Sequence, residues 1–235
     1  MNIKLSDEYK AGIRSSIEKI RGVIGEKAVL CAATKTVPVE AINFAARECG
    51  LTCMGENRVQ ELLSKYDELD KDLLDIHFIG RLQTNKVKYI IDKVSMIQSL
   101  DSLRLAAEID KRAAEKGIIM DVLIELNVGE EETKGGILPS EFDDFAEKIS
   151  DFNNIRVRGI MTIGPICASK EEYTEYFKKT YQFFIDILPK KIHNIYKPVL
   201  SMGMSDNYEV ALACGSTMIR PGTAIFGHRD YQVNN

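Results

Sequence analysis

Short apolar runs alternate with segments of helical spacing along most of the chain. Eight runs are typical of buried strands, over residues 29–33, 51–54, 75–79, 95–99, 121–127, 157–163, 198–202 and 217–221. Between them the apolar spacing predicts helices that include 103–116, 173–187 and 208–214. Ahead of the first run, one face of an additional helix is marked by Tyr9, Ile13, Ile17, Ile20 and Ile24.

Capping patterns support three of these helices. Asp101 is a candidate N-cap for the first of them. Ser169 with Glu172 forms a capping-box pattern ahead of the second, and Asp206 with Glu209 repeats it before the third.

The apolar runs are continuous rather than alternating, which indicates strands buried on both faces. Strands that alternate with helices at this spacing are typical of parallel pairing, and eight such units close into a barrel. We therefore predict an α/β single-domain (β/α)8 TIM barrel over residues 1–235, with an extra N-terminal helix. The competing architecture, an open doubly wound sheet, commonly has fewer strands and a glycine-rich turn after its first strand, whereas here that turn reads ATKTVP.

The composition is that of an ordinary globular protein. The 235 residues carry 31 Lys and Arg against 35 Asp and Glu, a formal charge of −4, and 45% are hydrophobic. Without a basic run, a nucleic-acid partner is not expected. The longest apolar run, 28–33, is too short to cross a membrane, and no hydrophobic signal core opens the chain, so we expect a cytoplasmic protein with no membrane partner.

The five cysteines contain no C-x-x-C pair, and reduced thiols are the simplest interpretation. The three histidines lack zinc-type spacing with the cysteines. Folding can still bring distant residues together, but the sequence predicts no metal site.

Lys35 is the first residue with candidate chemistry. It follows an apolar strand directly, and active sites of barrels lie at the carboxyl ends of the strands. Burial disfavours the ammonium form of lysine, and a neutral amine forms a Schiff base with an aldehyde or ketone. The alternative is a lysine that reaches solvent or pairs with a carboxylate such as Glu56.

The last two strands are followed by residues suited to a phosphate group. The seventh run leads into SMGMSDNYE, with hydroxyls at Ser201 and Ser205 and a flexible Gly203, and the eighth into RPGTAIFG, with Gly222 and Thr223. Barrels frequently bind phosphate at these two loops. The alternative is that these are ordinary turn and capping residues.

Four further residues are placed to contact a ligand. Arg220 is a permanent hydrogen-bond donor, so it would keep a facing pyridine nitrogen unprotonated and weaken the ring as an electron sink. The Asn57 amide can reach a ring oxygen or cap the following helix. Met161 and Met202 can pack against a ligand, although methionines there are more often core.

The motifs AATKT, MGENRVQE, HFIGRLQTNKVK, ELNVGEEETKGG, RGIMTIGP and LSMGMSDNYEVALACGSTMIRPGTAIFG together resemble the pyridoxal phosphate homeostasis proteins, single-domain relatives of the alanine racemase N-terminal barrel. The resemblance implies pyridoxal 5'-phosphate (PLP) as the cofactor. Lys35 would hold it as a Schiff base, Arg220 would face its pyridine nitrogen, and Asn57 would lie beside the ring. Its phosphate would be held by Ser201, Gly222 and Thr223. Pro221 departs from the branched aliphatic residue expected there.

The resemblance implies a protein that holds PLP and hands it to apo-enzymes, with no established catalytic residue. A two-domain racemase takes a second acid/base group, a tyrosine, from a separate domain. Tyr208 and Tyr231 are candidate substitutes within this chain. The resemblance allows a monomer, and the loop 129–136 either closes over the ligand or is a solvated turn.

Two other functions stay open. One is a PLP-dependent enzyme of amino-acid chemistry, such as a weak racemase. The other is an aldolase in which Lys35 attacks a sugar-phosphate carbonyl with no cofactor present.

Overall fold

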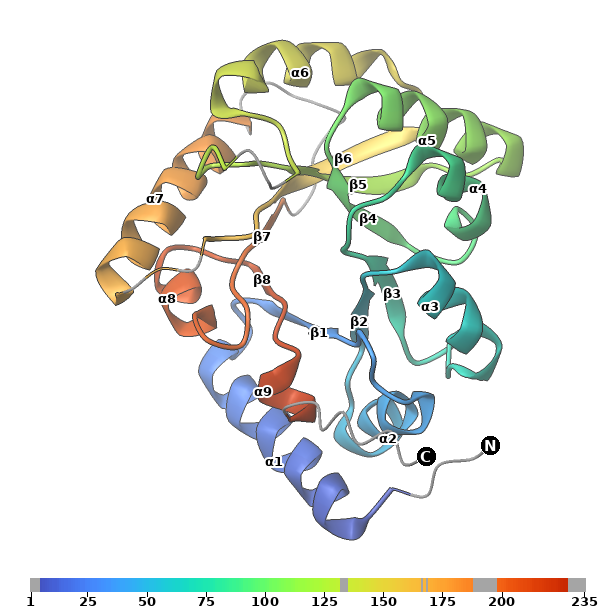
Figure 1. Cartoon of the computed structure of the whole chain (residues 1–235), viewed down its shortest axis with the longest axis vertical. Coiled ribbons are helices and arrows are strands. Elements are labelled where there is room, and N and C mark those ends of the chain that lie inside the picture. The colour runs from blue at the N-terminus through green and yellow to red at the C-terminus, as the bar shows by residue number, and fades with distance from the viewer. Residues whose placement is uncertain (1–4, 132–134, 166, 168, 188–197, 228–235) are drawn as a thin grey trace.

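Eight parallel strands form a closed barrel in the computed structural model, which describes residues 5–131, 135–165, 167, 169–187 and 198–227. Each strand pairs with the next one in the chain, and the last pairs with the first. Helices surround the ring of strands (Figure 1). The predicted barrel and its order of elements are confirmed.

The strands match the eight predicted runs, with ends shifted by a few residues. They are β1 (Val29–Ala33), β2 (Cys53–Glu56), β3 (Asp75–Phe78), β4 (Met96–Leu100), β5 (Met120–Glu125), β6 (Ile155–Met161), β7 (Val199–Ser201) and β8 (Met218–Ile219). Every residue of β4 and β5 is buried, as expected for strands covered on both faces. β8 is short, so Arg220 lies just beyond its end rather than on the strand.

The helices that follow the strands pack around the barrel. They are α2 (Val39–Cys49), α3 (Val59–Lys65), α4 (Val87–Ile90), α5 (Leu103–Lys116), α6 (Phe142–Lys148), α7 (Lys170–Ile187), α8 (Tyr208–Ala213) and α9 (Thr223–Phe226). Single turns of 3-10 helix occupy Tyr66–Glu68, Thr84–Lys86, Pro139–Glu141 and Ile149–Asp151. Within the described ranges, no helix is long and apolar enough to span a bilayer.

The additional helix α1 (Asp7–Ile24) precedes the barrel, as predicted. Its buried face consists of Ile13, Ile17, Ile20 and Ile24. It lies against α2 and α9 (Figure 1). The helix therefore covers the part of the barrel where the first and last strands meet.

Two of the three predicted caps are wrong. Ser102, not Asp101, caps α5: its backbone is extended and its Oγ accepts an amide hydrogen from the first turn. At α8 the N-cap position is held by Asn207 rather than Asp206, and the Asn207 side chain closes the preceding turn. The Ser169 cap is confirmed, because its Oγ accepts the amide hydrogen of Glu172 at 3.2 Å.

Pairing between β1 and β8 continues past the end of β8. The amide of Ala33 donates to the carbonyl of Pro221 at 2.9 Å. A proline lacks an N–H but keeps its carbonyl, so Pro221 is accommodated where only an acceptor is needed. The next residue, Gly222, fits because a Cβ there would lie 3.0 Å from the Ala33 carbonyl oxygen.

Candidate functional site

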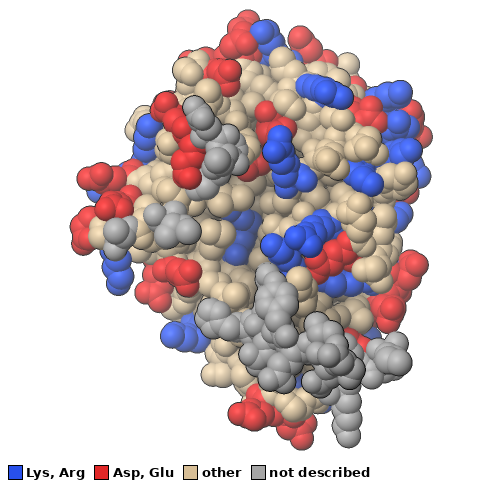
Figure 2. Space-filling model, viewed as in Figure 1, with Lys and Arg blue, Asp and Glu red and all other residues tan. Residues whose placement is uncertain are grey.

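A cavity of about 750 Å³ opens beyond the carboxyl ends of β1, β2, β3, β7 and β8. This volume is in the range of small-molecule sites. Its lining includes five of the eight predicted site residues: Lys35, Asn57, Arg220, Gly222 and Thr223. The barrel face seen in Figure 1 is hollowed near its centre, and Lys and Arg side chains border the hollow (Figure 2).

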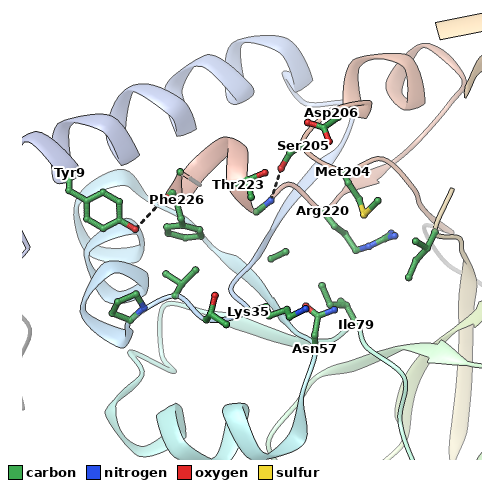
Figure 3. A pocket seen from close by; sticks show the side chains of 17 residues that line it. Tyr9, Lys35, Asn57, Ile79, Met204, Ser205, Asp206, Arg220, Thr223 and Phe226 are labelled. Carbon is green, nitrogen blue, oxygen red and sulfur yellow. Dashed lines mark hydrogen bonds between the residues drawn. The ribbon is translucent and has the colours of Figure 1, made fainter. Parts of the chain in front are cut away.

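Lys35 enters the cavity from the turn after β1. The residue before it, Thr34, is fully buried and its amide donates to the carbonyl of Gly55. The residue after it, Thr36, has a positive φ of 62°, so the chain turns sharply at this point. Lys35 is half-buried, and its side chain lies beside Asn57 on one wall of the cavity (Figure 3).

The alternative partner of Lys35, the buried carboxylate of Glu56, is bound by other residues. Glu56 Oε1 accepts from Lys65 Nζ at 2.8 Å and from Thr34 Oγ1 at 2.9 Å. Burial raises the pKa of Glu56, and the nearby ammonium of Lys65 opposes this rise. Among the described residues, none forms a hydrogen bond or ion pair with the Lys35 amine, which is therefore available to a ligand.

Arg220 lies on the floor of the cavity with 4% of its surface exposed. Its two terminal nitrogens donate to Ser201 Oγ at 2.6 Å and to the Thr162 carbonyl at 2.8 Å. Burial lowers the pKa of Arg220, but the ordinary value for arginine is so high that the guanidinium stays charged. The positively charged guanidinium of Arg220, held by these two hydrogen bonds, therefore faces the cavity.

Three predicted ligand residues do not line the cavity. Ser201 is fully buried, and its hydroxyl links Arg220 to the Gln98 side chain, to which it donates at 2.7 Å. Met161 packs in the barrel interior and Met202 in the main core, both fully buried. The methionine at the cavity wall is Met204, which is 38% exposed.

Hydroxyl and amide groups gather on the wall opposite Lys35 and Asn57 (Figure 3). Ser205 Oγ accepts the amide hydrogens of Gly222 and Ala224, each at 3.1 Å. Thr223 begins α9 beside them. The hydroxyls of Ser205 and Thr223 can bind an anionic oxygen group, with the Lys35 side chain and the Arg220 cation on other sides of the cavity.

The alternative role considered for Asn57, an N-cap of the following helix, is wrong. Helix α3 starts at Val59 with Arg58 in the N-cap position, and no side chain caps it. The Asn57 backbone is held by close packing, because a Cβ on Gly80 would lie 2.1 Å from the Asn57 carbonyl oxygen. The Asn57 amide is thus a feature of the cavity rather than of the helix end.

The sequence did not identify the cavity residues that come from the ends of the chain. Tyr9 of α1 lines the cavity, and its hydroxyl donates to the Phe226 carbonyl at 3.1 Å. Its spacing with the isoleucines of α1 indicated only a core position. The hydroxyl of Tyr9, on an otherwise apolar helix face, was the one feature of the sequence that could have indicated its place at the cavity.

A buried carboxyl group outside the cavity lining interacts electrostatically with Arg220. Glu125 ends β5 with 8% of its surface exposed. Burial, with a smaller contribution from Asp101, raises the pKa of Glu125 to about 7, against the opposing effect of Arg220 and Arg81. This carboxyl group therefore titrates near neutral pH.

The chain matches the family model of the alanine racemase N-terminal domain over residues 10–230. An alanine racemase from Clostridium difficile superimposes with a TM-score of 0.75 at 18% identity, covering 94% of this chain and 58% of the racemase. This barrel, with a lysine after its first strand, thus belongs to the class of the alanine racemase N-terminal domain. The superposition covers that part of the racemase and not its remaining residues.

Closer relatives define the family. The chain is 49% identical over 205 residues to the pyridoxal phosphate homeostasis protein of Aquifex aeolicus, covering 87% of this chain and 88% of that protein. It is 39% identical over 210 residues to the protein of the same name from Escherichia coli, covering 88% of each. The structure of PipY from Synechococcus elongatus with PLP bound matches with a TM-score of 0.83 at 30% identity, covering 92% of this chain and all of that one. The chain belongs to the pyridoxal phosphate homeostasis protein family.

Substituting Glu125→Gln should stabilise the protein at alkaline pH. An unfolded glutamate has a pKa of about 4.3, whereas that of folded Glu125 is about 7. The folded state therefore keeps a proton that the unfolded chain releases. The free energy of unfolding falls as the pH rises from about 4.3 to about 7. We expect Glu125→Gln to raise the free energy of unfolding at pH 8 by up to about 3 kcal/mol, with little change at pH 4.

Urea denaturation of both proteins at the two pH values measures this difference. An equal effect of the substitution at pH 4 and pH 8 would contradict the assigned pKa of Glu125.

Proposed function

We propose that this protein binds PLP, with Lys35 as the residue that bonds covalently to the cofactor, and that it holds and delivers PLP within the cell. The observation that carries the proposal is the half-buried amine of Lys35, which has no partner among the described residues and faces a cavity lined by Arg220 and by the Ser205, Gly222 and Thr223 group. The names of the relatives and the PLP in the PipY structure support it.

The residues of the cavity fit a phosphorylated aromatic aldehyde. When bound, the cofactor would supply an aldehyde carbon that condenses reversibly with amines to form a Schiff base. Lys35 supplies the amine, and the Asn57 side chain lies beside it to hydrogen-bond a ring substituent. The hydroxyls of Ser205 and Thr223 would bind the phosphate, and the Gly222 amide, which donates to Ser205 Oγ at 3.1 Å, would hold the Ser205 hydroxyl in place.

Ser201 takes a different part in this proposal from the one expected of it. Its hydroxyl positions the guanidinium of Arg220 from below, at 2.6 Å, rather than contacting the phosphate. Arg220 would in turn donate a hydrogen bond to the pyridine nitrogen. Because a guanidinium donates and does not accept, that nitrogen would stay unprotonated, which would make the ring a weak electron sink.

We propose carriage of the cofactor rather than catalysis. Racemisation needs acid and base groups on both faces of the substrate carbon. Tyr208 is buried in α8 and does not line the cavity, and Tyr231 lies outside the described residues. Delivery to an apo-enzyme would occur when an amine of that enzyme replaces the Lys35 amine on the aldehyde carbon. We propose that the protein does this as a monomer, with residues 1–235 forming one PLP-binding domain.

Removal of the Lys35 amine should abolish covalent loading. Lys35→Ala incubated with PLP is expected to lack the visible absorption band of the native protein, because no other lysine among the described residues lines the cavity to condense with the aldehyde. Lys88→Ala, which changes an exposed lysine of α4, serves as the matched control and should keep the band.

A band that survives in Lys35→Ala would contradict the proposal. A native protein that binds sugar phosphates and no PLP would favour the aldolase. Exchange of the α-proton of amino acids at an enzyme-like rate would instead favour the racemase.

Thr223→Val should weaken binding of PLP but not of pyridoxal, which lacks the phosphate. The substitution keeps the shape of the side chain and removes one hydroxyl. Loss of one hydrogen bond to a charged group corresponds to about a tenfold weaker affinity or more. Absorbance titrations with both compounds measure the two affinities, and equal weakening of both would place the phosphate elsewhere.

A further inference from the structure

Two thiols and an imidazole converge inside the barrel, outside the cofactor cavity. Cys31 of β1, Cys53 of β2 and His77 of β3 place their ligand atoms within 4.8 Å of one another. None of the three lines the cavity that contains Lys35. Their exposed fractions are 0%, 3% and 2%.

The order of the strands brings these residues together. Cys31 and Cys53 are register partners on adjacent parallel strands, so their side chains leave the sheet on the same side. Cys53 is the register partner of Asp75, and His77 follows two residues later on the same face. The spacing along the chain, which does not resemble a zinc motif, gives no sign of this cluster.

The geometry points to a second binding site in this protein, for one thiophilic cation of the Zn²⁺ or Cu⁺ class, held by Cys31, Cys53 and His77. A tetrahedral zinc ion with bonds of about 2.3 Å to sulfur and about 2.0 Å to nitrogen separates its ligand atoms by roughly 3.5 to 3.8 Å. Cys53 Sγ lies 3.7 Å from His77 Nδ1. The Cys53 and His77 pair is therefore already at the separation that an ion requires, and the other ligand atoms, within 4.8 Å, need to move closer for all three to bind it.

The surroundings of His77 favour Nδ1 as the ligand atom. His77 Nε2 lies 3.2 Å from Asp75 Oδ2, so the carboxylate holds a proton on Nε2 and leaves the lone pair on Nδ1, beside the thiols. A carboxylate behind a histidine is the usual outer partner of a metal-bound imidazole. Gln98 Nε2 lies 2.8 Å from Nδ1, and this hydrogen bond must break when an ion binds.

The remaining neighbours favour a soft ion. Met218 and Ile79 pack with the two cysteines in a small apolar cluster. Thiolate and imidazole ligands in a dry site select zinc or cuprous ions, whereas magnesium and calcium prefer oxygen ligands. The Met218 thioether adds a further sulfur beside the cluster, and its Sδ accepts from Gln98 Nε2 at 3.2 Å.

Cobalt titration of the reduced full-length protein under anaerobic conditions tests this site. We expect a thiolate-to-cobalt charge-transfer absorption that saturates at one ion per chain, and its loss in Cys53→Ser. Cys214→Ser is the control and should keep the absorption, because Cys214 is the C-cap of α8, its Sγ contacts the Thr174 carbonyl at 3.8 Å, and it is not part of the cluster.

A second variant covers the case in which Cys53→Ser does not fold. The Asp75 side chain is 54% exposed, so Asp75→Asn leaves the core intact. It should keep the absorption but weaken cobalt affinity about 10- to 100-fold, as expected for a partner behind a ligand. The proposal would be overturned if the native protein showed no saturable cobalt absorption. It would also be overturned if the absorption persisted in a folded Cys53→Ser variant, or if Asp75→Asn bound cobalt with unchanged affinity.

Discussion

Hydrogen bonding between the first and last strands is the interaction on which the cavity depends. Lys35 follows β1 and Arg220 follows β8, so these residues share a cavity only because the sheet closes. The bond from the Ala33 amide to the Pro221 carbonyl continues this pairing to the edge of the cavity. The absence of a side chain on Gly222 lets the two backbones approach there.

The charges near the pairing of β1 with β8 explain why the Lys35 amine is available to a ligand and the Lys65 amine is not. Lys65 forms ion pairs with Glu56 and Glu61, at 2.8 and 2.7 Å, beneath the turn that carries Lys35. The buried carboxylate of Glu56 is thus neutralised by a residue outside the cavity. Lys35 keeps its amine for a ligand, and Arg220 is held from below by Ser201 rather than by a carboxylate.

Much of this could be predicted from the sequence, because strand order and the carboxyl ends of strands follow from apolar periodicity. That periodicity gave all eight strands, the extra helix and the positions of Lys35, Asn57, Arg220, Gly222 and Thr223 at one end of the barrel. It could not show that Ser201 points beneath Arg220 while Ser205 reaches the cavity, since the direction of each side chain depends on where β7 ends. The Cys31, Cys53 and His77 cluster depends on register between strands, which no pattern within one strand specifies.

The most direct test of the account is borohydride reduction of the PLP-loaded protein, followed by peptide mapping by mass spectrometry. The account predicts one stable pyridoxyl adduct, on the peptide that contains Lys35. An adduct on a different lysine, or no adduct in a fully loaded sample, would contradict it.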